Sequence, residues 1–153
     1  MIEIISGSSY SELKKSISHL DTKSPFLDIN FFKALEKSKS IGENTGWISF
    51  PLIARSNNEI IGFMPIFLKE HSYGEYVFDH AWADAFQQHG LNYYPKMISA
   101  IPFTPLTGSR VLAKDSEVKK AMIKAIEKIL VEYKISSCHI LFPNKKDHEL
   151  FNE

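Results

Sequence analysis

Residues 97–142, MISAIPFTPLTGSRVLAKDSEVKKAMIKAIEKILVEYKISSCHILF, decide the fold, because they place a long amphipathic segment between two short apolar ones. Residues 97–103 and 137–142 have the length and composition of buried strands. Asp115 or Ser116 can cap a helix between them that runs to about Lys134. The apolar residues of this helix fall on one stripe: Val118, Met122, Ala125, Ile126, Ile129, Leu130 and Tyr133. A strand, a helix and a strand in this order predict a right-handed crossover and hence an α/β fold.

The N-terminal part of the chain predicts a strand followed by two helices. Residues 1–6 have strand composition. Ser9 and Glu12 have the spacing of a capping box, which predicts a helix over residues 10–19. Asp28 can cap a second helix in a region that closes at Gly42. The apolar face of this second helix comprises Ile29, Phe32 and Leu35.

A hairpin is predicted for the middle of the chain. Residues 47–55 and 59–69 are rich in β-branched and aromatic side chains, and Ser56-Asn57-Asn58 between them suits a tight turn, since asparagine tolerates positive φ. Pro51 and Pro65 have no backbone N–H, so each must lie where the ladder needs no hydrogen bond.

Two short helices complete the expected order of elements. Tyr73-Gly-Glu-Tyr76 is typical of a turn, and Asp79 can cap a helix that stops at Gly90. The residues expected to face inward from that helix are Trp82, Ala85 and Phe86. Asn144 can cap a last helix that ends at Phe151.

Composition limits the classes of partner and compartment. The 153 residues suffice for one domain, 1–153, and 18 basic against 18 acidic side chains argue against a nucleic-acid partner. No apolar stretch approaches the ~20 residues that would span a bilayer, and no secretory signal is present, so we expect a cytoplasmic chain without membrane contact. The single Cys138 lies in an apolar run and is expected to be a small buried hydrophobe. The histidines have no zinc-site spacing, so no metal is expected.

The order of elements is similar to the GNAT acyltransferase fold, and four segments resemble a bacterial family of predicted N-acyltransferases. These segments are His71-Ser-Tyr-Gly-Glu-Tyr-Val-Phe-Asp79, Ala81-Trp-Ala-Asp84, Tyr93-Tyr-Pro-Lys96 and Pro102-Phe-Thr-Pro-Leu-Thr-Gly108. The family is labelled FemAB-like or peptidoglycan biosynthesis/recognition. The resemblance implies a GNAT-like mixed sheet flanked by helices, in a chain that stops before the last two strands of that fold. It also implies transfer of an acyl or aminoacyl group to an amine of a small molecule or peptide.

Two functions stay open at this point. In the first, the chain is part of an N-acyltransferase. In the second, it is a non-catalytic scaffold or recognition half-domain of a longer acyltransferase. In either case we expect the isolated chain to be inactive. A sheet that ends early leaves an open edge at residues 137–142, which predicts a homo-oligomer through strand pairing.

Acyl transfer to an amine requires groups that move protons. An alkylamine with a pKa near ~10.4 must lose a proton, for which His80, Glu75, Asp79 and Asp84 are candidates. On a helix His80 and Asp84 lie four residues apart and can pair as a base; alternatively they are an ordinary surface pair. Tyr94, next to Tyr93, can protonate a leaving thiolate, or both rings are packing residues.

The loop over residues 104–110 is the candidate for an acyl-CoA site. The resemblance implies that a loop in this position holds the pyrophosphate. Gly108 permits close approach, and Arg110 can fork onto phosphate. The hydroxyl donors of the loop are Thr104, Thr107 and Ser109. The alternative is a rigid structural turn in which Arg110 pairs with a helix carboxylate. Lys96 can contact a phosphate or carboxylate, or is simply exposed.

Overall fold

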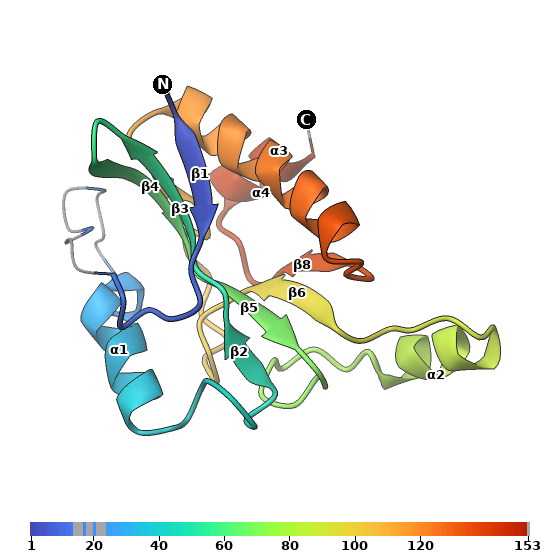
Figure 1. The fold of residues 1–153 in the computed structure, drawn as a ribbon. Helices are drawn as coiled ribbons and strands as arrows, with labels where there is room; N and C mark the ends of the chain where they lie inside the picture. Colours follow the sequence, from blue (N-terminus) through green and yellow to red (C-terminus); the bar gives the residue numbers. More distant parts are fainter. Residues whose placement is uncertain (14–16, 18–19, 21–23, 153) are drawn as a thin grey trace.

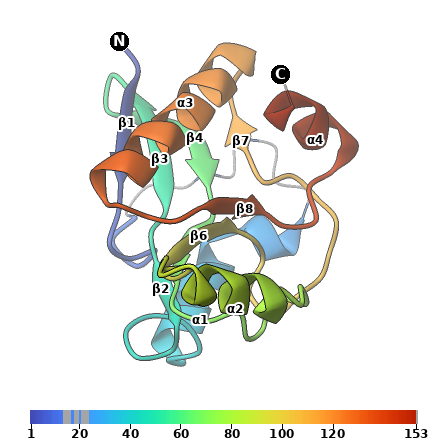
Figure 2. The same cartoon turned by 90° about the vertical axis from the view of Figure 1, so that its right-hand side faces the viewer.

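The computed structural model describes residues 1–13, 17, 20 and 24–152, and in them it places two four-stranded sheets (Figures 1 and 2). The first has the order β1 (Glu3–Ser6), β3 (Leu52–Ser56), β4 (Glu59–Met64), β7 (Leu112–Ala113), with every pair antiparallel. The second has the order β2 (Trp47–Ser49), β5 (Ile66–Lys69), β6 (Lys96–Ser99), β8 (Cys138–Ile140), and only β6 and β8 are parallel. The predicted α/β class and the strand at residues 1–6 are confirmed.

The predicted hairpin is confirmed, and its two prolines explain why there are two sheets. Leu52 pairs with Met64 in the first sheet, whereas Ser49 pairs with Phe67 in the second. Pro51 and Pro65 fall in the gaps between these pairs, outside either ladder. At the far end, Asn57 and Asn58 take φ values of 48° and 67°, as a tight turn requires.

The long helix α3 (Ser116–Glu132) joins the parallel strands β6 and β8, as predicted. The Asp115 carboxylate caps it by accepting a 2.9 Å hydrogen bond from the Val118 N–H. Three residues of the predicted stripe are fully buried, namely Val118, Met122 and Ile126. A methyl group at Gly62 of β4 would lie 2.6 Å from the Met122 Sδ, so this glycine allows α3 to pack closely on the sheet.

Helix α1 (Ile29–Lys37) covers the opposite side of the sheets from α3 (Figures 1 and 2). Asp28 caps it as predicted, with its side chain accepting a hydrogen bond from the Asn30 N–H, and Phe32 joins an aromatic cluster. The short 3-10 helix η2 (Pro25–Leu27) precedes it. Along β3 the side chains alternate between two apolar cores, so the first sheet is packed on both faces.

The helix predicted over residues 10–19 is wrong where it can be examined. Residues 10–13 and 17 are not helical, and the rest of that range lies outside the described residues. The Ser9 side chain does not act as a helix cap: its hydroxyl donates to the Glu36 carboxylate of α1, which also accepts from the Tyr10 N–H, both at 2.7 Å. A partner distant in the sequence therefore replaced the local cap.

Helix α2 (His80–Gln88) begins after Asp79 and ends before Gly90, as predicted, but it contains no buried residue. It projects from the body of the molecule (Figure 1). Trp82, expected to face inward, is 67% exposed, and the Asp79 side chain makes no capping hydrogen bond. The helix contacts the body through Phe86, whose ring packs 5.2 Å from that of Tyr93. Only this end of the predicted apolar face has a surface to pack on.

Helix α4 (Lys145–Phe151) closes the fold and is capped by the Asn144 side chain, as predicted. Strand β8 is the outer strand of the second sheet, as expected for residues 137–142, and its pairing with another chain stays a prediction.

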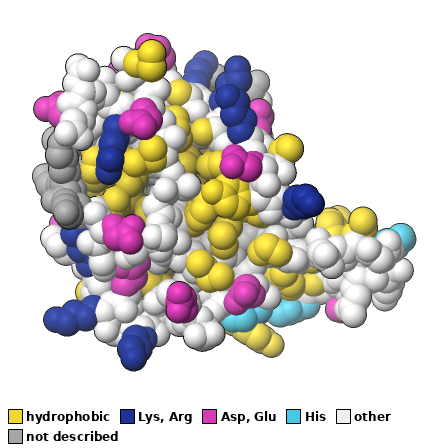
Figure 3. Space-filling model, in the orientation of Figure 1, with side chains coloured by type: hydrophobic (Ala, Val, Ile, Leu, Met, Phe, Trp, Pro, Cys, Tyr) yellow, Lys and Arg dark blue, Asp and Glu magenta, His cyan; other side chains and the backbone are white. Residues whose placement is uncertain are grey.

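Hydrophobic side chains also gather between β1 and α3 (Figure 3), where a cavity of about 790 Å³ is lined by Ile4, Leu52 and Ile129. In the part of the chain that is described, no helix is long and apolar enough to cross a membrane.

Candidate functional site

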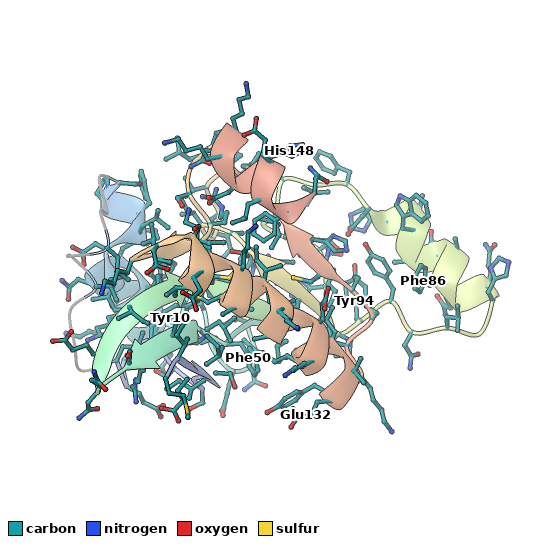
Figure 4. The ribbon with its side chains drawn as sticks, turned by 90° about the horizontal axis from the view of Figure 1, so that it is seen from above. Tyr10, Phe50, Phe86, Tyr94, Glu132 and His148 are labelled. Carbon is teal, nitrogen blue, oxygen red and sulfur yellow. The ribbon has the colours of Figure 1, made fainter. Side chains whose placement is uncertain are left out.

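A pocket of about 520 Å³ lies beside α2. One face of the helix supplies His80, Ala83, Asp84 and Gln87, whose spacing of three and four residues places them on adjacent turns. The other walls come from residues 71–73 and 91–94. Tyr94 lies in the second of these segments and Phe86 lies on α2, and both are labelled in the view from above (Figure 4). The pocket thus joins three segments that are separate in the sequence.

Three of the five candidate catalytic residues, His80, Asp84 and Tyr94, line this pocket. The other two, Glu75 and Asp79, are buried outside the lining. His80 and Asp84 lie on one face of α2, and among the described residues no hydrogen bond or ion pair joins them, so their action as a base stays a prediction. The His80 ring instead lies 6.1 Å from the ring of Tyr73, which the projecting position of α2 permits.

A buried charged cluster accompanies the pocket, centred on the Lys96 ammonium group. The Lys96 Nζ lies 2.7 Å from Glu75 Oε2, 2.5 Å from Asp79 Oδ2 and 2.8 Å from the Ser72 Oγ. All three ammonium hydrogens therefore have acceptors. The expectation that Lys96 contacts a carboxylate is confirmed, although both carboxylates belong to the chain itself and the lysine is fully buried.

Lys69 is a second buried lysine in this cluster, and it lies directly opposite Lys96 across β5 and β6. Two like charges in that position repel each other. The Glu75 carboxylate offsets this, with Oε1 at 3.9 Å from the Lys69 Nζ. The Lys69 ammonium also lies 3.9 Å from the centroid of the Trp47 ring and donates to the Tyr73 carbonyl. The cluster thereby holds residues 72–79 against the second sheet.

Two hydrogen bonds link the cluster to the pocket. The hydroxyl groups of Ser72 and Tyr94, both pocket residues, lie 2.7 Å apart. The Tyr93 hydroxyl, also in the lining, donates to Asp79 Oδ2 over 2.6 Å. Each buried carboxylate is therefore connected to the pocket wall through side chains, Asp79 through Tyr93 and Glu75 through Lys96 and Ser72.

Burial and the neighbouring charges act in opposite directions on the pKa values of Glu75, Asp79 and Lys69. Burial raises the pKa of Glu75, although Lys96 and Lys69 oppose the shift. Burial also acts to raise the pKa of Asp79, but hydrogen bonds from Lys96, Ser72 and Tyr93 outweigh it and lower that pKa to about 2. Burial lowers the pKa of Lys69 to about 7, against the attraction of Glu75. The two neighbouring carboxyl groups therefore have very different proton affinities.

The lowered pKa of Asp79 predicts a measurable loss of stability in acid. Its contribution is complete above the ordinary carboxyl value and is lost as the pH falls through about 2. The shift from 3.8 to about 2 corresponds to about 2 kcal/mol of unfolding free energy. Urea unfolding between pH 5 and pH 2 should therefore show a shallower decline for Asp79→Asn than for the unmodified chain. Equal slopes would contradict this assignment.

The loop over residues 104–110 is closed on itself. Arg110 is 0% exposed, and its guanidinium donates to the carbonyls of Leu141, Ser109 and Leu106 at 2.8, 2.9 and 2.5 Å. The Gly108 N–H donates to the Phe142 carbonyl. Arg110 therefore cannot fork onto a bound phosphate in this arrangement, because all its nitrogens already have acceptors.

Two of the three hydroxyl groups of that loop are also hydrogen-bonded within the chain. The Thr104 hydroxyl donates to the Pro102 carbonyl, the Ser109 hydroxyl donates to Asp147 of α4, and Thr107 is exposed. The Arg110 and Val111 N–H groups also donate to Asp147 Oδ2, at 2.6 and 3.1 Å. The structure agrees with a rigid turn tied to a helix carboxylate, except that Asp147 binds the Arg110 backbone and not its guanidinium. None of these loop residues lines the pocket beside α2.

Sequence reasoning did not identify Ser72 and Lys69 and left the role of Lys96 open. The sequence does offer one signal: Lys69 ends the apolar run over residues 59–69, and Lys96 comes directly before the apolar run over residues 97–103. Within the described residues, no group of three histidine, cysteine, aspartate or glutamate side chains is arranged to hold a metal ion. The Cys138 thiol is half-buried in the structure, and burial raises its pKa to about 12.

The fold and the pocket define an α/β protein with a polar, partly aromatic pocket backed by buried ion pairs. A protein-family model described as FemAB-like, peptidoglycan biosynthesis/recognition, matches residues 2–153. The chain therefore belongs to the FemAB-like family, which confirms the resemblance of the four segments and connects the chain with peptidoglycan. No curated protein and no solved structure matches the chain in these comparisons.

Proposed function

We propose that this chain supplies the amine-binding pocket of a transferase that acts on peptidoglycan precursors, with an acyl or aminoacyl group passing to the amine. The observation that supports this best is the meeting of His80, Asp84 and Tyr94 in one pocket from separate segments. Family membership supports the peptidoglycan connection.

The chemistry of the lining suits a cationic amine. Among the described residues, Asp84 is the only acidic side chain in the lining, so an ammonium group would find its counter-ion there. The rings of Tyr73, Tyr93 and Tyr94 add faces on which a cation can rest. His80 lies on the same face of α2 as Asp84 and can exchange a proton with the bound amine.

The acyl donor is proposed to bind away from residues 104–110, because the Arg110 guanidinium, the Gly108 N–H and two of the three loop hydroxyls are already paired within the chain. Acyl-CoA is kept as a proposed donor only because the resemblance to the GNAT fold implies it. This closed loop also favours the second candidate function, a recognition half-domain that binds the amine and leaves the transfer to another part of a longer protein.

The test is a binding titration followed by a transfer assay. The ligand is a peptidoglycan stem peptide with a free lysine side-chain amine, and its control is the same peptide with that amine acetylated. We expect chemical shift changes at pocket residues with the free amine only. Asp84→Asn should weaken binding roughly tenfold, since it removes a charged hydrogen bond. The matched variant Glu127→Gln, exposed on α3, should bind as the unmodified chain does.

Each outcome separates the candidates. Binding with transfer from acyl-CoA or aminoacyl-tRNA supports the transferase, and binding without transfer supports the recognition half-domain. Equal affinity for the free and acetylated peptides, or no binding at millimolar peptide, would overturn the proposal.

A further inference from the structure

A continuous row of hydrogen bonds leads from the pocket to the buried carboxylate of Glu75. It runs from the Tyr94 hydroxyl to the Ser72 Oγ (2.7 Å), from there to the Lys96 Nζ (2.8 Å), and on to Glu75 Oε2 (2.7 Å). Tyr94 and Ser72 line the pocket, whereas Lys96 and Glu75 are fully buried side chains. The second oxygen of Glu75, Oε1, has no hydrogen-bond partner in the described part of the chain.

We propose that Tyr94, Ser72, Lys96 and Glu75 form a proton relay that carries the proton of a bound amine from the pocket to the buried carboxylate. This inference rests on the proposed function of the pocket. Tyr94 would touch the amine as the catalytic residue, while Ser72, Lys96 and Glu75 would act through it as positioning residues. The relay connects two candidate catalytic residues that the pocket wall separates, because Tyr94 lines the pocket and Glu75 is buried outside its lining.

The proton balance closes along the row. The amine gives a proton to the Tyr94 oxygen as the Tyr94 hydroxyl proton passes to the Ser72 oxygen. Lys96 first gives a proton to Glu75 Oε2 and becomes a neutral amine, and its freed lone pair, turned towards Ser72 by rotation of the amine group, then accepts the Ser72 hydroxyl proton. At the end Lys96 is again an ammonium, both hydroxyls are restored, Glu75 is neutral and the substrate nitrogen has a free lone pair. That lone pair can then form the bond to the acyl carbon.

The environment of the two carboxylates suits this division of roles. Glu75 is faced by Lys69 from β5, Lys96 from β6 and Asp79 from the start of α2, and burial raises its pKa in spite of both lysines. Asp79 has a pKa of about 2 and stays ionised, so Lys96 keeps a counter-ion when Glu75 takes up the proton. His139 of β8 is a further titratable group near Lys96 and Asp79. Neighbouring acids with separated proton affinities are typical of proton-transfer sites.

The first test needs no ligand. The carbon signals of the Glu75 carboxyl and the Tyr94 Cζ are followed by NMR as the pH is raised. We expect the ionisation of Glu75 to appear as a matching inflection at Tyr94, to be lost in Ser72→Ala and to be retained in Ser72→Thr, which keeps the hydroxyl. An inflection that survives in Ser72→Ala would overturn the relay, because it would show that Ser72 transmits nothing.

The second test follows the proton during binding. The carbon signal of the Glu75 carboxyl is recorded by NMR while the free-amine stem peptide is added. In the unmodified chain the amine proton passes to Glu75, so the signal should move towards that of a neutral carboxyl, whereas the acetylated peptide should leave it unchanged. Glu70→Gln, an exposed neighbour, should match the unmodified chain, and Ser72→Ala, which interrupts the row, should leave Glu75 ionised.

The outcomes keep the two proposals apart. If the peptide does not bind, the proposed function fails and the NMR titration alone decides the relay. If it binds and leaves the Glu75 carboxyl ionised, the relay fails while the amine pocket stands. If Ser72→Ala does not fold, the Glu75 signal of the unmodified chain with the free and the acetylated peptide remains decisive.

Discussion

Replacing Lys96 by methionine is expected to lower the free energy of unfolding by about 3–5 kcal/mol, the usual cost of removing one partner from a buried ion pair. The methionine fills much the same volume, but it leaves Glu75 and Asp79 without their main counter-charge in a region closed to water. Lys69 cannot take over, because its Nζ lies 3.9 Å from Glu75 and is directed to the Tyr73 carbonyl. Urea unfolding followed by circular dichroism measures the change.

Two comparisons show whether the loss comes from the uncompensated carboxylates. Lys145→Met removes an exposed lysine whose Nζ lies 3.9 Å from Glu149, and such surface pairs contribute roughly 0–1 kcal/mol. Adding Glu75→Gln and Asp79→Asn to Lys96→Met should recover part of the lost stability, since no ion then remains buried without a partner. A loss in Lys96→Met no larger than in Lys145→Met would contradict the role assigned to the cluster.

The cluster matters for the site because it fixes the pocket wall. Residues 72–79 form no regular element, and their position depends on bonds from the two lysines and from Trp47, whose Nε1 donates to the Tyr73 carbonyl. The Ser72 and Tyr73 side chains that line the pocket are part of this segment. The same charges that stabilise the fold therefore also position the proposed relay.

Much of the fold could be predicted because its signals are local. The stripe that begins at Val118, the Asp115 cap and the paired asparagines at 57 and 58 each act within a few residues. The position of Pro51 and Pro65 outside the ladders follows from their missing N–H groups, but the division of the expected mixed sheet into two sheets was not predicted. Local patterns could not predict that the Glu36 carboxylate of α1, distant in the sequence, binds the Ser9 hydroxyl and the Tyr10 N–H in place of a helix cap.

The candidate site was predictable only in part, for the same reason. The helical spacing of His80 and Asp84 correctly placed both on one face of α2. The sequence does not reveal the strand register that sets Lys69 opposite Lys96. The buried cluster around these two lysines was therefore not predicted. Likewise, the inward face expected for Trp82 assumed a neighbouring surface that α2 does not have. Chemistry built from long-range pairs becomes visible only when the pairing is known.

Asp147→Ala is expected to produce the second large effect, a loss of about 3–4 kcal/mol, because it leaves several buried donors without an acceptor at about 1–3 kcal/mol each. The Asp147 carboxylate is buried and accepts from the Ser109 hydroxyl, the Arg110 and Val111 N–H groups and the Lys119 ammonium. Burial acts to raise its pKa, but these four bonds outweigh it and lower the pKa. The measurements are urea unfolding and amide hydrogen exchange.

The pattern of the loss decides what residues 104–110 do. Asp147→Asn keeps one acceptor oxygen and should lose only about 1–2 kcal/mol, whereas Glu149→Ala on the same helix, whose side chain is largely exposed, should change stability by less than 0.5 kcal/mol. In Asp147→Ala the Arg110 and Val111 amides should exchange faster, since they lose their acceptor, while α1 stays protected. If Asp147→Ala instead matches Glu149→Ala in stability, the loop is not held by this carboxylate, and its closed form cannot be the reason for placing the acyl donor elsewhere.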